Sequence, residues 1–174
     1  LLGLINDILD LSKVEAGKLE LQYKATDAKA LCNELEQIFA QKTQEQGIDL
    51  IIEADDLPEA IVVDELRLRQ ILVNLTSNAI KFTESGHVKI KATSEPTSEG
   101  TTVRFAVEDS GIGIPADQQD KVFGAFEQTT GQSAAKFGGT GLGLAISKRL
   151  AQMMNGDITL TSEVGTGSTF TVEL

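Results

Sequence analysis

Residues 136–146 form a glycine-rich stretch whose chemistry suits a phosphate. The stretch reads KFGGTGLGLAI, and an apolar helical pattern begins within it. Glycine lets the main chain approach another group without a Cβ in the way. A loop of this kind that leads into a helix N-terminus offers unpaired N–H groups and the positive end of the helix dipole. A glycine-rich surface loop before a core helix explains the same residues, so this stretch alone leaves both interpretations open.

A second set of polar residues follows one face of a helix expected over residues 65–82. Asn74, Asn78 and Lys81 are spaced 4 and 3 residues apart, which places them in one row beside the apolar stripe of that helix. Asparagine is unfavourable inside helices because its side chain competes for main-chain hydrogen bonds. Two asparagines one turn apart therefore indicate a functional role, such as ligand binding. An amide oxygen can ligate Mg²⁺, and a lysine can bind phosphate. A solvated helix face is the alternative.

The third motif is DSGIGIP, residues 109–115, at the end of a strand expected over residues 102–107. A carboxylate followed by two glycines can lie at the floor of a cleft with little main chain above it. Asp109 would there accept a hydrogen bond from an exocyclic amine such as that of adenine. An unliganded Asp-Ser-Gly turn also accounts for this motif.

The elements that must position these motifs follow from hydropathy and capping signals. Helices are expected over residues 1–14, 27–46, 65–82, 117–123 and from 142 to about 153, with Asp64 capping the third. Strands are expected over residues 19–23, 48–53, 60–63, 88–92, 102–107, 157–162 and 168–174. Residues 128–139 are small and polar, and we expect them to be mobile and to act as a lid. We expect a helical segment at 1–18 and one compact domain at 19–174.

The composition limits the possible function classes. The chain has 174 residues, of which 41% are hydrophobic and 24% are charged, as in ordinary globular domains. Its net charge of −11 argues against nucleic acid as a partner, and it requires local donors and a cation to hold any polyphosphate. No apolar run is long enough to cross a membrane, so we expect no membrane contact. A single Cys32 excludes an internal disulfide, and a start without Met indicates an excised fragment.

Five segments together resemble the N, G1, F, G2 and G3 boxes of sensor histidine kinases, in the order of that family. They are residues 74–83, 109–113, 122–128, 139–144 and 165–170. Residues 1–21 resemble the end of the dimerisation helix of hybrid members, so the resemblance covers essentially the whole chain. It implies an α+β fold, namely a two-layer α/β sandwich of the Bergerat type. The sheet would be mixed and mostly antiparallel, with helices on one face and an N-terminal helical stub.

The resemblance also implies roles in binding ATP with Mg²⁺. Asn78 would ligate Mg²⁺, Asn74 would support the metal or a phosphate, and Lys81 would contact phosphate. Phe82 would pack beside the nucleotide, and Asp109 would accept from the adenine amine. Asn74 and Lys81 are the candidate catalytic residues. Gly113 would leave room for the ring, and Thr169 would lie near the adenine. The main-chain N–H groups that would meet the phosphates are those of Gly139, Gly141, Leu142 and Gly143. The remaining cofactor-binding candidates are Gly111, Lys136 and Thr140.

The implied function is the ATP-binding catalytic domain of a two-component sensor histidine kinase. Relatives in the wider ATPase superfamily carry a water-activating Glu where this chain has Asn74. An amide cannot act as a general base at neutral pH, so Asn74 fits transfer of the γ-phosphoryl group rather than hydrolysis. No acceptor box precedes Leu1, and His87, the only histidine, lies in the wrong context. We therefore expect transfer to a histidine outside the fragment and no autophosphorylation.

The implied partners are a dimerisation and phosphoacceptor domain, in a homodimeric parent, and a response-regulator receiver domain. A cytoplasmic location is expected, with a parent that can be anchored in a bacterial inner membrane. Two alternatives remain. A non-catalytic ATP sensor is favoured by the departures of Gln128, Ala134 and Ala135 from the family's lid pattern. An ATP-driven clamp of the chaperone or topoisomerase kind is disfavoured by Asn74.

Overall fold

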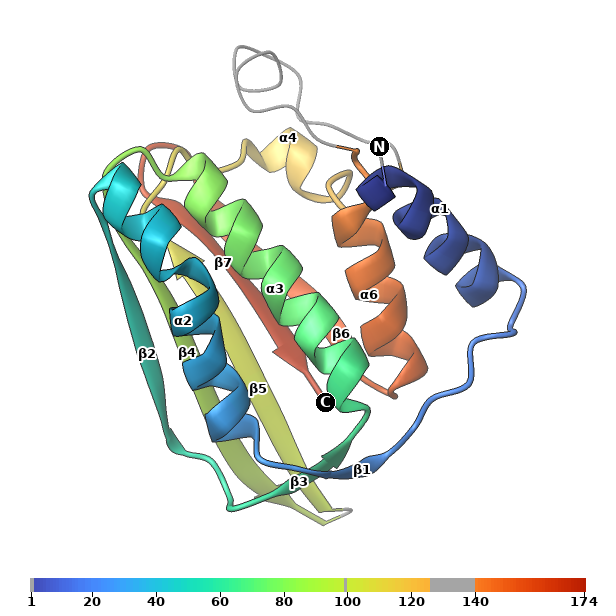
Figure 1. The fold of residues 1–174 in the computed structure, drawn as a ribbon. Coiled ribbons are helices and arrows are strands. Elements are labelled where there is room, and N and C mark those ends of the chain that lie inside the picture. Colours follow the sequence, from blue (N-terminus) through green and yellow to red (C-terminus); the bar gives the residue numbers. More distant parts are fainter. Residues whose placement is uncertain (1, 99, 126–139) are drawn as a thin grey trace.

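The protein is built on a five-stranded sheet with helices on one face. The computed structural model describes residues 2–98, 100–125 and 140–174 (Figure 1). The strand order is β2-β4-β5-β7-β6, in which β2 runs parallel to β4 and every other neighbouring pair is antiparallel. The strands are β2 (Ile48–Asp56), β4 (Gly86–Thr97), β5 (Gly100–Asp109), β6 (Asp157–Glu163) and β7 (Gly167–Glu173).

Three helices form the second layer. They are α2 (Ala28–Gln46), α3 (Glu65–Phe82) and α6 (Gly143–Met153), and they cover the same face of the sheet (Figure 1). The expected two-layer sandwich with a mixed, mostly antiparallel sheet is confirmed. The short helix expected over residues 117–123 is limited to α4 (Ala116–Gln119). Within the described ranges, no helix combines the length and the apolar character that crossing a membrane requires.

The core lies between these helices and the inner face of the sheet. Leu68, Leu72 and Leu75 of α3 are fully buried or nearly so, and they face the alternating inner residues of β4 and β5. The register pairs Ile90 with Val107 and Val88 with Asp109. Because side chains alternate along a strand, this register carries Asp109 to the same inner face as the apolar residues before it.

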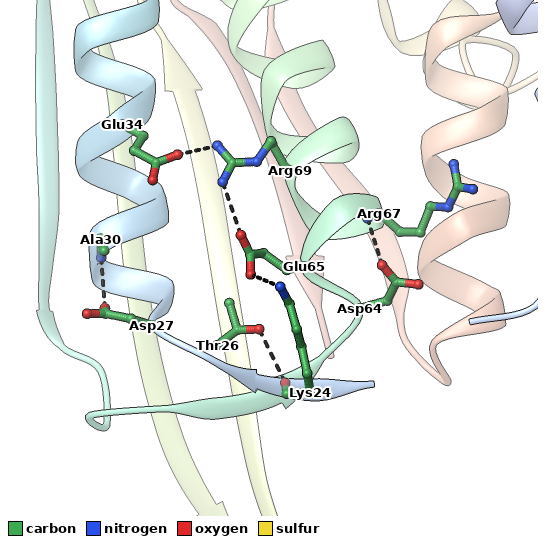
Figure 2. A network of polar contacts seen from close by, with 9 residues as sticks. All are labelled: Lys24, Thr26, Asp27, Ala30, Glu34, Asp64, Glu65, Arg67 and Arg69. Atoms are coloured by element: carbon green, nitrogen blue, oxygen red, sulfur yellow. Dashed lines mark hydrogen bonds and ion pairs between the residues drawn. The ribbon is translucent and has the colours of Figure 1, made fainter. Parts of the chain in front are cut away.

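Local capping signals account for the bounds of α2 and α3. Asp27 accepts a hydrogen bond from the main-chain N–H of Ala30 at 2.8 Å, and Asp64 accepts from Arg67 N at 3.1 Å (Figure 2). An aspartate at this position satisfies an N–H group that has no partner inside the helix. Arg69 joins the two helices, since its guanidinium contacts both Glu34 of α2 and Glu65 of α3 (Figure 2). The helices expected over residues 27–46 and 65–82 are confirmed.

The N-terminal segment differs from the expectation at one place. Helix α1 (Leu2–Glu15) packs against α6, and Val14 near its end is only 2% exposed. The strand expected over residues 19–23 is wrong, because the strand here is β1 (Lys24–Thr26), which pairs with β3 (Ile61–Val63). Leu19 is buried outside any ladder, and the N–H of Gln22 donates to the Asp64 carboxylate at 2.8 Å. A side-chain acceptor thus replaces the ladder that the alternating pattern suggested.

Candidate functional site

The DSGIGIP loop rests on the C-terminal end of α3. The N–H of Ile112 donates to the Phe82 carbonyl at 3.4 Å. A Cβ added at Gly111 would overlap that carbonyl oxygen and the Asp109 carboxylate, so only glycine fits there. The tertiary structure therefore brings the DSGIGIP loop into contact with α3, the helix that carries Asn74 and Asn78.

The glycine-rich stretch at residues 136–146 also contacts α3, at Asn74. A Cβ added at Gly143, in the first turn of α6, would overlap Oδ1 of Asn74 and come within 3.1 Å of its Nδ2. Nδ2 donates a hydrogen bond to Oγ of Ser147 at 2.9 Å, and Ser147 is only 2% exposed. Asn74 is thus held flat against the first turns of α6.

Asp109 lies at the floor of the site. It is 7% exposed, and its Oδ1 accepts from the Gly111 N–H at 2.9 Å. Burial raises the pKa of Asp109, while hydrogen bonds from the main chain of Gly111 and Ser168 oppose that rise. A buried carboxylate held by its own loop is a preorganised acceptor for one specific donor, as an adenine amine would be.

Strand β7 supplies the neighbour of Asp109. Ser168 pairs directly with Asp109 and is 6% exposed, whereas Thr169 pairs with Glu108 and is half-buried. Alternation therefore places Thr169 on the opposite face of the sheet. The sequence predicts Thr169 near the adenine, but the β7 residue that pairs with Asp109 and shares its inner face is Ser168.

Gly113 makes a close approach to main chain rather than facing open space. Its φ is 71°, and a Cβ there would overlap the carbonyl group of Glu163 at the end of β6. The loop is fastened to the same strand, because the N–H of Ile114 donates to Oγ of Ser162 at 2.8 Å. In this structure the glycine accommodates the β6–β7 turn, which differs from the expected role of leaving room for a base.

Asn78, Lys81 and Phe82 line the edge of the site on α3, and all three are half-buried. The Lys81 ammonium lies 5.0 Å from the centroid of the Phe82 ring. Burial lowers the pKa of Lys81, and the nearby charge of Lys42 adds to this effect. An ammonium destabilised in this way gains from an anionic ligand, which agrees with the expected contact to phosphate.

The described part of the phosphate loop begins at Thr140. Gly141 has a φ of 70°, Leu142 is fully buried, and the Leu142 N–H donates to Thr140 Oγ1 at 3.3 Å. The Leu142 side chain makes no capping bond to α6, so a ligand can use the first N–H groups of this helix. Lys136, Gly139 and the lid expected over residues 128–139, with Gln128, Ala134 and Ala135, lie outside the described residues.

The donor set fits a cation that arrives with a nucleotide. Over residues 2–98, 100–125 and 140–174 there is no group of three or more His, Cys, Asp or Glu side chains that could hold a metal. Mg²⁺ bound with ATP would instead be coordinated by the amide oxygen of Asn78, by phosphate oxygens and by water. Mg²⁺ usually binds in this way beside nucleotides, with few protein ligands.

The sequence reasoning missed Ser147 and Ser168, which hold Asn74 and Asp109. For Ser147 a signal existed, because it follows Gly143 by four residues and so lies on the same face of α6. For Ser168 no local signal existed, since its place depends on the register between β5 and β7.

Comparisons with known proteins agree with this arrangement. Residues 63–174 match the family described as histidine kinase-, DNA gyrase B-, and HSP90-like ATPase. The chain is 44% identical over 174 residues to the aerobic respiration control sensor protein ArcB of Escherichia coli, which covers 99% of this chain and 22% of ArcB. The chain therefore spans about a fifth of the length of that relative.

Solved structures give the same result. Full-length ShkA in complex with AMPPNP matches with a TM-score of 0.86 and 37% identity, over 99% of this chain and 35% of ShkA. Histidine kinase ThkA in complex with the response regulator protein TrrA matches with a TM-score of 0.71 and 27% identity, over 99% of this chain and 48% of ThkA.

Proposed function

We propose that this chain, which belongs to the family of histidine kinase-, DNA gyrase B-, and HSP90-like ATPases, binds Mg²⁺-ATP and transfers the γ-phosphoryl group to a histidine. It is the ATP-binding catalytic domain of a sensor histidine kinase. The observation that carries the proposal is Asn74, an amide held against the first turn of α6 by Gly143 and Ser147. A side chain that cannot take a proton from water occupies the place where a hydrolysing relative would carry a base.

Each wall of the site has a separate task in this proposal. Asp109 accepts the hydrogen bond of the adenine amine and sets the orientation of the nucleotide. The first turn of α6, from Leu142 to Gly143, binds the phosphates through main-chain N–H groups. Lys81 contacts a phosphate from α3. Asn78, supported by Asn74, would hold Mg²⁺, which when bound offsets phosphate charge in a protein whose net charge is −11.

The acceptor histidine is proposed to lie on a dimerisation domain. His87 is the only histidine of the chain, and its Nε2 lies 3.2 Å from Oε1 of Glu108 on the outer face of the sheet. That face is opposite to the one that carries Asp109, so His87 does not face the nucleotide site. We keep residues 1–18 as the proposed end of the dimerisation hairpin and residues 19–174 as the catalytic domain.

Partners beyond ATP belong to the parent protein and are proposed with it. Ile5, Ile8 and Leu9 of α1 are 45%, 43% and 51% exposed, which supports a helical partner such as the other dimerisation helices of a homodimer. The ThkA–TrrA complex supports a response regulator as the next phosphoryl acceptor. We place this domain in the cytoplasm, with a parent that can be anchored in a bacterial inner membrane.

Two measurements test the proposal. Calorimetric titration with ATP, with and without Mg²⁺, should show binding that Mg²⁺ strengthens, and Asn78→Asp should change that Mg²⁺ dependence. Mixing the chain with a separately supplied dimerisation domain and γ-labelled ATP should then label a histidine. Binding without transfer would instead favour an ATP sensor, and steady-state hydrolysis would favour an ATP-driven clamp. Absence of ATP binding at every Mg²⁺ concentration would contradict the proposal.

A further inference from the structure

We propose that Ser147 is a positioning residue that fixes the carboxamide of Asn74, so that its oxygen rather than its NH₂ group faces the polyphosphate and its cation. The inference rests on the proposed function, because it concerns the same nucleotide site. It adds a residue that lies outside the five motifs. It also assigns one chemical role to Asn74, for which the resemblance leaves two roles open, support of the metal or contact with a phosphate.

The geometry places the two ends of the carboxamide differently. Nδ2 points along α6 to Oγ of Ser147, 2.9 Å away, and the bond joins residues 73 positions apart in the chain. Oδ1 lies beside Gly143, one turn closer to the N-terminus of the same helix, where it is the atom nearest to the position of a Cβ. Oδ1 is therefore the carboxamide atom nearer to Gly143 in the first turn of α6, while Nδ2, which lies 3.1 Å from the same Cβ position, donates to a residue one turn further along.

The electrostatics of α6 favour the same orientation. The N-terminal turn of a helix carries partial positive charge on its unpaired N–H groups, so it attracts an amide oxygen more than an amide NH₂ group. Ser147 is only 2% exposed, so water has little access to replace its hydroxyl as a partner for Nδ2. Without that partner the half-buried NH₂ group of Asn74 loses a hydrogen bond, and the amide becomes free to rotate.

The orientation decides what Asn74 can do. An oxygen that faces the ligand can ligate Mg²⁺ or accept from its water shell, whereas an NH₂ group can only donate to phosphate oxygens. Ser147 would therefore make Asn74 part of the cation wall. Loss of Ser147 should weaken the contribution of Mg²⁺ to ATP binding and leave binding of metal-free ATP nearly unchanged.

The test compares the Mg²⁺ enhancement of ATP affinity, defined as the dissociation constant without Mg²⁺ divided by that with Mg²⁺. We expect Ser147→Ala to lower this enhancement about fivefold, the effect of one hydrogen bond, while the affinity for metal-free ATP changes less than about twofold. In an Asn74→Ala background, Ser147→Ala should have no further effect. The side-chain amide resonances of Asn74, identified by their loss in Asn74→Ala, should shift in Ser147→Ala.

Two further variants separate positioning from general packing. Thr76→Val removes a buried hydroxyl from α3 whose Oγ1 has no hydrogen-bond partner among the described residues, so it should leave the enhancement unchanged. Gly143→Ala displaces the Asn74 carboxamide without touching Ser147, and it should reproduce the loss of enhancement. If Ser147→Ala does not fold, an enhancement that Gly143→Ala leaves intact would still overturn the inference, because the orientation of Asn74 would then not matter for the cation.

The possible failures are distinguishable. If the wild-type chain binds no ATP, the proposed function itself fails. If it binds with a Mg²⁺ enhancement that Ser147→Ala and Gly143→Ala both leave intact, Ser147 does not position Asn74. Equal losses with and without Mg²⁺, or an undiminished effect of Ser147→Ala in the Asn74→Ala background, would show a merely structural role and overturn the inference.

Discussion

Asp109 combines two opposed requirements at the scale of one residue. Burial makes its charged form costly, yet the proposed hydrogen bond to adenine is stronger when the acceptor is ionised. The structure meets this conflict with main-chain donors, since Gly111 and Ser168 both donate to the carboxylate. Burial is the larger effect, and the pKa of Asp109 stays raised. The site therefore keeps a carboxylate whose ionisation costs more in the folded protein than in water.

Replacement of Asp109 by Asn should separate affinity from stability. A raised pKa in the folded state means that stability from this group is present at low pH and is lost as pH rises through that pKa. Asp109→Asn should thus leave the free energy of unfolding at pH 7 equal to or above that of wild type, while ATP binds about 10- to 100-fold more weakly. Urea denaturation and calorimetric titration measure the two quantities.

The pH profile supplies the control for this variant. Wild-type affinity, divided by that of Asp109→Asn, should fall as pH drops through the raised pKa of Asp109, because protonation removes the charge that strengthens the accepted hydrogen bond. The ratio cancels the titration of ATP itself. A ratio that is constant from pH 7 down to the onset of acid unfolding would contradict the assigned role.

Helix ends determine how the elements meet. Asp64 caps α3 and also accepts from the N–H of Gln22 at 2.8 Å, so one 4%-exposed carboxylate joins the helix to the segment that precedes β1. Asp27 caps α2 through a single exposed bond from Ala30. The two caps look alike in sequence, but only Asp64 holds a second segment. Since α3 carries Asn74, Asn78 and Lys81, its start also sets where these side chains lie.

The two caps should therefore differ in their contribution to stability. Asp64→Ala leaves two N–H groups without their acceptor in a partly buried place, so we expect a loss of about 2–3 kcal/mol in the free energy of unfolding. Asp27→Ala, the matched control, should lose about 1 kcal/mol. Urea denaturation of both variants measures the difference, and equal losses would show that the bond to Gln22 contributes little.

At the scale of the whole molecule, α1 is attached to the catalytic body by a small polar cluster as well as by Val14. Asp10 accepts from Nε2 of Gln70 at 2.9 Å and lies 3.8 Å from the guanidinium of Arg67. About one turn earlier in α1, a carboxylate oxygen of Asp7 accepts from Thr140 Oγ1 at 3.5 Å. The helix proposed to belong to the dimerisation domain thus touches both α3 and the phosphate loop.

Loss of the Asp10 contacts should loosen α1 without unfolding the body. Asp10→Ala removes one half-buried hydrogen bond and a weak ion pair, worth about 1 kcal/mol together, so amide exchange in α1 should accelerate about fivefold. Exchange in the core of α3 should stay unchanged. Glu15→Ala, an exposed acidic residue of the same helix, is the control. Equal acceleration in both helices would mean that α1 is an integral part of the domain.

Local patterns in the sequence were sufficient for helices α2 and α3 and for the row of candidate side chains on α3. Asp27 and Asp64 mark the starts of α2 and α3, and the spacing of Asn74, Asn78 and Lys81 places them together on α3. Such features depend on residues three or four positions apart, which a helix always brings together. The failure at residues 19–23 shows the limit, because an alternating pattern does not say whether a partner strand is available.

Only the tertiary structure decided which groups meet across the site. The bond from Asn74 to Ser147 joins α3 to α6, and the choice of Ser168 over Thr169 beside Asp109 depends on strand register. A slip of one residue would exchange those two side chains between faces, and no signal within β7 alone specifies the pairing. Residue types and local spacing therefore determined what chemistry was present, while packing between distant segments determined which atoms face each other.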